Sequence, residues 1–123
     1  AIQKQKRDAI KEQMCAQKNK KYDCKLFTQQ IVLPNRSVRE WVNQPHFDFD
    51  KKNELLLNIK DVLKNCKQKK EIPVKEKHKD AVIKAFALPI TISNRPSWII
   101  IHETKWHEIK IYGISDSEHI FQK

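Results

Sequence analysis

The change in the spacing of apolar residues near Ala81 is the feature that most constrains the fold of this chain. In residues 51–66, apolar side chains recur three and four positions apart, which is typical of an amphipathic helix, and Asp50 is a suitable N-cap. From Ala81 onward the pattern becomes typical of strands. The strand candidates are residues 81–92, 97–103 and 106–115. Strands with such short connections pair as antiparallel neighbours, so we predict an α+β fold with helices on one face of an antiparallel sheet.

The first quarter of the chain has a different composition. Residues 2–18 consist of good helix formers with a thin apolar stripe, which predicts a peripheral helix or the tail of an upstream linker. Residues 26–33 are β-rich, and residues 37–43 have the spacing of a short helix. We therefore divide the chain into a basic helical linker or entry-domain tail, 1–25, and a folded domain, 26–123.

Positive charge is concentrated in two segments. The chain has 25 basic and 15 acidic residues, a net charge of +10. Residues 1–25 contain eight basic and three acidic residues, and a second lysine-rich run covers residues 67–79. These basic segments could bind nucleic acid, an acidic protein or an anionic membrane surface. They could also form a solvated surface that binds no partner. Nucleic acid leads among the functional readings, because lysine and arginine neutralise phosphates.

Several classes of site are disfavoured. The only glycine, Gly113, excludes a glycine-rich phosphate loop, and no apolar stretch is long enough for a membrane span. Three cysteines without a CxxC pair do not match the ligand spacing of a zinc site, and free thiols are the simplest interpretation. A bridge between Cys15 and Cys24 stays open. The pair His102 and His107 lacks a third metal ligand, so we expect no metal and no cofactor.

The short link between the last two strand candidates affects which side chains share a face. If Thr104 and Lys105 form a two-residue loop, His102 faces His107. One face then carries Trp98, Ile100, His102, His107, Ile109 and Ile111. A slip of one residue would reverse this assignment for one strand.

Five histidines in a basic, glycine-poor chain suit metal-free RNA cleavage. In that reaction an imidazole or carboxylate takes a proton from the ribose 2′-hydroxyl, an acid protonates the leaving oxygen, and a cation stabilises the phosphate. The candidate catalytic residues are His46, His78 and Ser115, and the candidate RNA- or phosphate-binding residues are Arg39, Lys52, Lys77 and Ser117. We expect the loops of His46 and His78 and the strand end at Ser115–Ser117 to form one site. Surface histidines and a capped turn are the alternatives.

The order of motifs over residues 26–118 resembles the nuclease-like module at the C-terminus of phage minor head proteins. The best matching pieces are Pro45-His46, Lys52-Asn53 with the following leucines, and the strand end Tyr112–Ser117. Those modules are assigned to the barnase-like, tRNase-colicin-like and interferase ribonucleases, a superfamily that also supplies toxin domains of contact-dependent inhibition and other polymorphic toxin systems. The resemblance implies a four-stranded antiparallel sheet, an RNA site on its open face and acid–base catalysis by His46.

From the resemblance we expect a ribonuclease toxin domain, released from a larger secreted or cell-surface protein, that cleaves tRNA in a target cytoplasm. An acidic immunity protein would neutralise it, since complementary charge accelerates association. Whether a host factor is needed stays open. The alternatives are a non-catalytic RNA- or DNA-binding module and an interaction domain of a phage head protein.

Overall fold

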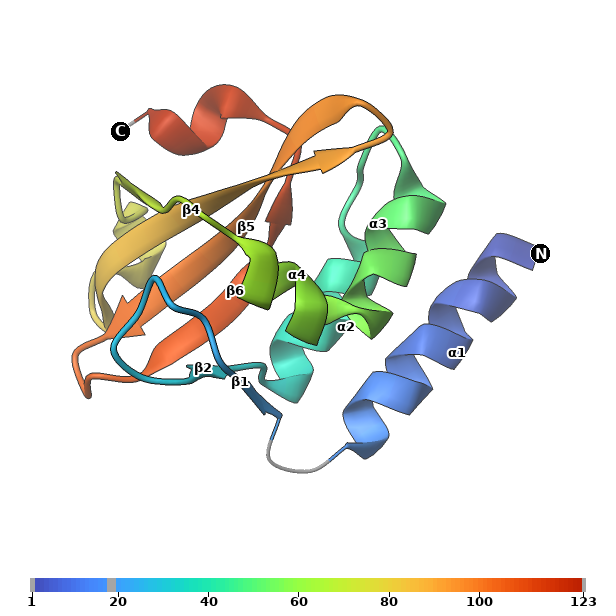
Figure 1. Ribbon diagram of the computed structural model, residues 1–123, viewed down its shortest axis with the longest axis horizontal. Coiled ribbons are helices and arrows are strands. Elements are labelled where there is room, and N and C mark those ends of the chain that lie inside the picture. Colours follow the sequence, from blue (N-terminus) through green and yellow to red (C-terminus); the bar gives the residue numbers. More distant parts are fainter. Residues whose placement is uncertain (1, 18–19, 123) are drawn as a thin grey trace.

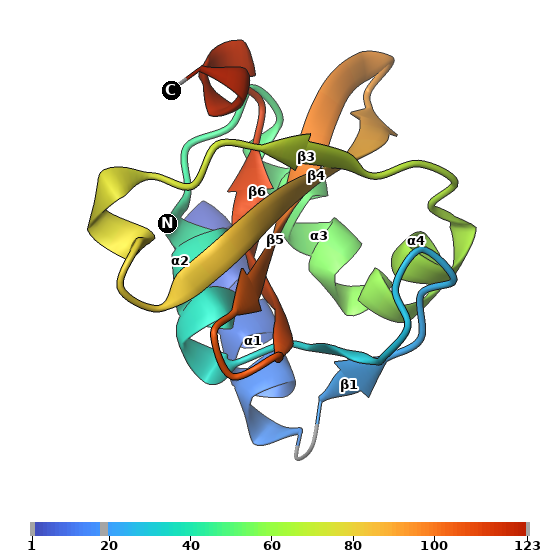
Figure 2. The same cartoon turned by 90° about the vertical axis from the view of Figure 1, so that its left-hand side faces the viewer.

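A six-stranded sheet organises the part of the chain that the structure describes, residues 2–17 and 20–122 of a computed structural model (Figure 1). The strands are β1 Lys21–Tyr22, β2 Ile31–Val32, β3 Lys70–Ile72, β4 Val82–Ile92, β5 Arg95–Thr104 and β6 Ile109–Ser115. The helices are α1 Ile2–Ala16, α2 Asn35–Asn43, α3 Phe49–Leu57 and α4 Ile59–Asn65, with short 3₁₀ turns η1 Glu76–His78 and η2 Glu118–Phe121. The strand order is β1-β2-β6-β5-β4-β3. Helices α1 to α4 lie on one side of the sheet (Figures 1 and 2).

The α+β class is as predicted, but the four-stranded antiparallel sheet is wrong. The sheet is mixed, because β2 runs parallel to β6 while every other described pair is antiparallel. The predicted loop around Lys70 forms the edge strand β3, which pairs with Ala85–Ala87 of β4. Strands of two or three residues are too short to show a period in the sequence. β2 and β3 form because the long strands β6 and β4 offer edges whose backbone groups need partners, and β1 pairs in turn with β2.

The predicted helix over residues 51–66 is also corrected. The chain forms two helices, α3 and α4, separated at Asn58, whose φ of −111° and ψ of 21° are not helical. Asparagine side chains compete for backbone hydrogen bonds, which makes them poor in helix interiors. The N-cap is Asp48 rather than Asp50, since Asp48 accepts a hydrogen bond from the Lys51 amide at 3.2 Å. The apolar stripe is nevertheless buried as expected, with Leu56 fully enclosed.

The turn between β5 and β6 differs from the two-residue loop considered above. It spans residues 105–108, and the Thr104 amide donates to the Glu108 carbonyl at 2.9 Å. As a result His102 pairs with Lys110 rather than with His107. Trp98 and Ile100 share one face of β5, as predicted. Because the turn is longer than two residues, Ile109 and Ile111 of β6 lie on the other face of the sheet, in contrast to the prediction.

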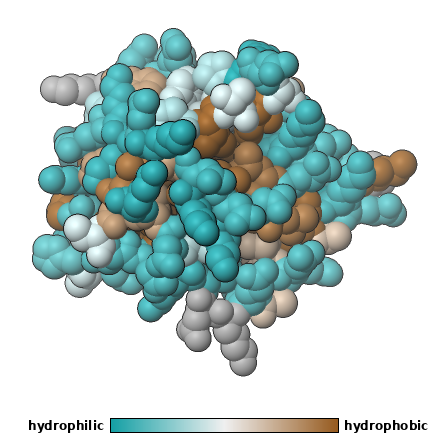
Figure 3. Space-filling model, viewed as in Figure 1, coloured by the Kyte–Doolittle hydropathy of each residue, from teal (hydrophilic) through white to brown (hydrophobic). Residues whose placement is uncertain are grey.

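Each face of the sheet has its own apolar cluster. The larger one lies under the helices and includes Ile99, Ile101 and Ile111. The smaller one lies on the face away from the helices and consists of Ile72, Ala85, Ala87, Trp98 and Ile100. Hydrophilic residues cover most of the surface seen in Figure 3, with apolar side chains exposed between them. We call the face of the smaller cluster the open face.

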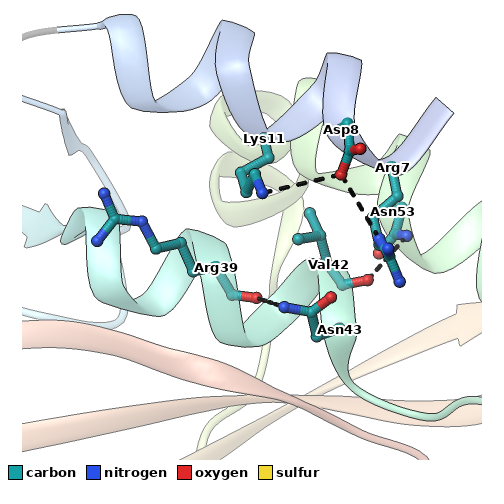
Figure 4. A network of polar contacts seen from close by, with 7 residues as sticks. All are labelled: Arg7, Asp8, Lys11, Arg39, Val42, Asn43 and Asn53. Carbon is teal, nitrogen blue, oxygen red and sulfur yellow. Dashed lines mark hydrogen bonds and ion pairs between the residues drawn. The ribbon is translucent and has the colours of Figure 1, made fainter. Parts of the chain in front are cut away.

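Helix α3 holds the end of α2 through a buried lysine. The ammonium of Lys52 donates to the carbonyl oxygens of Trp41, at 2.6 Å, and Gln44. In return the Trp41 indole donates to the Lys52 carbonyl at 2.9 Å. The Asn53 amide adds a bond of 3.3 Å to the Val42 carbonyl (Figure 4). These bonds fix the start of the loop that carries His46.

Helix α1 packs against α2 and α3, where the sequence predicted a peripheral helix (Figure 4). Its Ile10 and Met14 are buried in the larger cluster. Asp8 lies 3.8 Å from both Arg7 and Lys11, and such exposed ion pairs add little stability. The functional division of the chain at residue 25 stays a prediction.

Two adjacent leucines of α3 test this packing. Leu56 is fully buried, whereas Leu57 is 41% exposed. Leu56→Ala should lower the free energy of unfolding by about 2–5 kcal/mol, because it opens a cavity in the core. Leu57→Ala should change it by less than about 1 kcal/mol. Urea unfolding measures both values, and equal losses would contradict the described orientation of α3.

Candidate functional site

A cavity of about 290 Å³ opens on the open face of the sheet. Strands β5 and β6 form its floor, and the segment from β3 through η1 forms one wall. Glu40, Trp41 and Gln44 reach the cavity from the end of α2, which contacts β6 from the other side of the sheet. Figure 2 views the molecule from a side on which η1, α2 and β6 are all visible. The lining residues that carry chemistry are Glu40, Lys75, Lys77, His78, His102, Tyr112 and Ser115.

Three rings are in mutual contact at this cavity. The His102 ring stacks on Tyr112 with centroids 4.4 Å apart and an interplanar angle of 21°. The His78 ring lies 5.0 Å from His102 and 4.8 Å from Tyr112. Strand pairing explains half of this arrangement, because His102 and Tyr112 project from adjacent strands toward the open face. The turn η1 brings His78 over them.

Both imidazoles favour the neutral form. Burial, and then the neighbouring His78, lowers the pKa of His102 to about 4. Burial, followed by the charge of Lys77, lowers the pKa of His78, and Glu40 opposes that shift. A neutral imidazole has a free nitrogen lone pair and can accept a proton at neutral pH.

Cations flank the rings. Lys75 and Lys77 line the cavity, and the ammonium of Lys75 makes long contacts of 3.5 and 3.4 Å to the carbonyls of His119 and Gln122. Arg39 lines an adjoining hollow that shares Glu40, Gln44 and Tyr112 with the cavity. Of the predicted phosphate-binding residues, the structure thus brings Lys77 to the cavity and Arg39 beside it.

Ser115 and Ser117, at the end of β6, have different surroundings. Ser115 lines the cavity, whereas the Ser117 hydroxyl caps η2 by accepting from the His119 amide at 3.2 Å. Gly113 lies between the two strand-end serines and Tyr112, and a Cβ added there would meet no atom within 4 Å. The cavity therefore has room at Gly113 for a larger side chain.

His46 is held outside this cavity. Its Nδ1 accepts from the Asp48 amide at 2.9 Å, and its Nε2 lies 3.0 Å from the Ser97 hydroxyl. Ser97 donates to the Ser115 carbonyl at 2.9 Å, so His46 is the donor to Ser97 and is neutral with the proton on Nε2. Burial also lowers the pKa of His46, against the opposing effect of Asp116.

The side of the sheet also separates His46 from the ring cluster. Ser97 alternates with Trp98 and therefore points toward the helices, away from the open face. His78 and Ser115 share one cavity, and His46 joins them only through Ser97 and the strand backbone. Its role in catalysis stays a prediction.

Lys52 does not reach the solvent. Its side chain is fully buried, and its ammonium is bonded to two carbonyl oxygens at the end of α2. Burial, and then the charge of Arg7, lowers the pKa of Lys52 to about 8. In this conformation Lys52 positions the loop of His46 rather than facing a ligand.

Two residues of the ring cluster were absent from the predicted set. They are His102 and Tyr112, neither of which is among the predicted catalytic or phosphate-binding residues. The signal for His102 was available, since its alternation with Trp98 and Ile100 placed it on the open face. The sequence does not predict that either residue contacts His78, because this contact depends on the path of residues 73–81. Among the residues that the structure describes, no three His, Cys, Asp or Glu side chains are grouped to hold a metal ion.

A comparison with protein families decides the classification. The model of large polyvalent protein-associated domain 3 matches residues 1–112. The chain belongs to this family. It is therefore a domain associated with large polyvalent proteins. No curated protein and no solved structure matches the chain.

The match to large polyvalent protein-associated domain 3 covers β5, most of β6 and the ring cluster, and it ends before Ser115. Its description names no reaction, so it leaves the relation to barnase-like ribonucleases open. Within the described ranges, none of the helices of this large polyvalent protein-associated domain is long and apolar enough to cross a membrane.

The shifted pKa of His102 predicts a pH effect on stability. The unfolded state has the ordinary pKa near 6.5 and the folded state one of about 4, so between these values the unfolded state binds more protons. The free energy of unfolding should therefore fall as the pH drops from about 6.5 toward 4. His102→Gln should remove about 1–3 kcal/mol of that fall. Denaturant titrations at several pH values measure it, and an unchanged slope in the variant would refute the burial of His102.

Proposed function

We propose that this domain is a metal-independent ribonuclease whose site is the cavity of the open face. The observation that carries the proposal is the contact of His78, His102 and Tyr112 in a hollow flanked by Lys75 and Lys77. Aromatic rings stack on nucleobases, and lysine side chains neutralise the charge of phosphates. A neutral imidazole can act as the general base that accepts a proton. The resemblance of residues 26–118 to ribonuclease-like modules supports the same reading.

The chemistry requires only groups that this cavity supplies. His78 takes the proton of the ribose 2′-hydroxyl, and the 2′-oxygen then attacks phosphorus. The bond to the leaving 5′-oxygen breaks, which gives a 2′,3′-cyclic phosphate, and the Tyr112 hydroxyl protonates the leaving oxygen. Lys75 and Lys77 stabilise the charge that develops on the phosphate oxygens.

The family places such a domain in large proteins, which fits the proposal that it acts as a toxin module. We propose that a larger protein carries it from the cell surface into a target cytoplasm, where tRNA is the substrate. A net charge of +10 favours tRNA and an acidic immunity protein as partners, because opposite charges steer association.

A cleavage assay tests the proposal. The purified domain, incubated with total tRNA in EDTA, should yield discrete fragments that end in 2′,3′-cyclic phosphates. His78→Ala should reduce the rate at least ~100-fold, the low end for an acid–base group. His119→Ala, which removes an exposed histidine of η2, should cleave like the parent domain. Cleavage that requires added metal would refute the mechanism, and tight binding without fragments would favour a non-catalytic RNA-binding module.

A second variant tests the location of the site without removing a functional group. Gly113→Val places a side chain in open space inside the cavity, and valine is well tolerated in strands. Cleavage should fall at least ~10-fold through loss of room for substrate, while the melting temperature stays within a few degrees. Gly113→Ala should have an intermediate effect. Undiminished cleavage by the folded valine variant would place the site elsewhere.

A further inference from the structure

Trp106 differs from the other two tryptophans in its exposure. Its side chain is 62% exposed, whereas Trp41 is fully buried and Trp98 is 8% exposed. Trp41 donates a hydrogen bond inside the helical layer, and Trp98 packs edge-on against Phe121. Trp106 lies instead at the tip of the β5–β6 hairpin, where 105–108 form the turn.

The tip that carries Trp106 is held by several hydrogen bonds. The Thr104 hydroxyl accepts from the amides of Trp106, at 3.3 Å, and Glu108, at 3.2 Å. The Lys105 amide donates to the Ala81 carbonyl at 2.9 Å, which ties the tip to the start of β4. His107 has a φ of 63°, a left-handed conformation that side chains seldom adopt. A backbone fixed in this way presents the indole with little conformational entropy left to lose on binding.

The tip continues the strands that form the candidate site. His102 precedes Thr104 by two residues, which is about 7 Å along a strand, and Trp106 follows in the turn. Lys110 lies opposite His102 in β6, beside the ring cluster, and its ammonium is 3.5 Å from the Glu108 carboxylate. Lys105 places its ammonium 4.9 Å from the centroid of the Trp106 ring. A strand of RNA that left the cavity along β5 toward the tip would pass Lys110 before it reached the turn that carries Lys105 and Trp106.

We propose that Trp106 stacks on a base of unpaired RNA that extends from the cavity, so that the site takes an unpaired segment, such as a loop of the proposed tRNA substrate. This proposal rests on the proposed ribonuclease function only for the identity of the bound strand. Bases in a duplex already stack on one another, and only unpaired bases offer a free face to an indole. The adjacent Lys105 and the net charge of +10 would attract the phosphates that flank such a base.

Fluorescence reads this contact when the titration is repeated with Trp106→Phe, because Trp106 is the exposed indole while Trp41, although buried, also lines the cavity. The quenching should be lost in this variant. The probe is oligouridine with 2′-O-methyl groups, which blocks the nucleophile and so cannot be cleaved. Its addition should quench the tryptophan emission in a saturable manner. A 2′-O-methyl duplex of the same length should leave the emission unchanged at equal occupancy.

Affinity of the labelled oligouridine is measured by anisotropy in parallel. Trp106→Ala should weaken binding about 5- to 150-fold, the range expected for one stacked base, and Trp106→Phe should recover part of it. Leu57→Ala, which truncates another exposed apolar side chain on α3, serves as the matched control and should bind like the parent domain.

The outcomes separate this inference from the proposed function. Saturable binding without quenching, no binding at low salt, or an unchanged affinity in Trp106→Ala overturns the stacking contact, whether or not tRNA is cleaved. Equal quenching by the duplex overturns the preference for unpaired RNA. Quenching of the expected kind together with a failure to cleave tRNA overturns the ribonuclease and leaves Trp106 as part of an RNA-binding surface.

Discussion

The pairing of β5 with β6 determines where both the core and the candidate site can lie. Alternation along β5 sends Ile99 and Ile101 to the helices and Ile100 and His102 to the open face. The register with β6 then sets which side chains accompany them, and a four-residue turn rather than a two-residue one places Lys110 opposite His102. The isoleucines on the helical side hold this register, because a slip of one residue would expose them.

Burial and charge act together on the open face. The ring cluster occupies a small cavity in which desolvation keeps His78 and His102 neutral, while Lys75 and Lys77 provide positive charge at its edge. Glu40 is the carboxylate among the residues that line the cavity. Away from Glu40, a phosphate could approach Lys75 and Lys77 without displacing a carboxylate. A bound phosphate would also stabilise protonated imidazoles, so proton transfer and binding are coupled through the same charges.

The sequence predicted the three long strands and the short helix α2, but it failed on the strands β1 and β3 and on the division between α3 and α4. The stripe of Leu56 and its neighbours and the alternation of β4, β5 and β6 extend over enough residues to show a period. The strands β1 and β3 do not, and they form only where β2 and β4 supply a partner. Of the candidate residues, His78 and Ser115 meet in one cavity, while Lys52 is buried because α2 needs a donor at its end. Tertiary packing decides whether a lysine faces a phosphate or a helix carbonyl, and the local sequence around Lys52 does not predict that packing.

The central claim is that a nucleotide binds at the ring cluster of the open face. The most direct measurement is a titration of the histidine ring protons by nuclear magnetic resonance, with and without saturating uridine 3′-monophosphate. The signals of His78 and His102 should move on binding, and the pKa of His78 should rise, because the phosphate charge stabilises the imidazolium. Binding that moves only the signals of His107 and His119, or that leaves the pKa of His78 unchanged, would contradict the account.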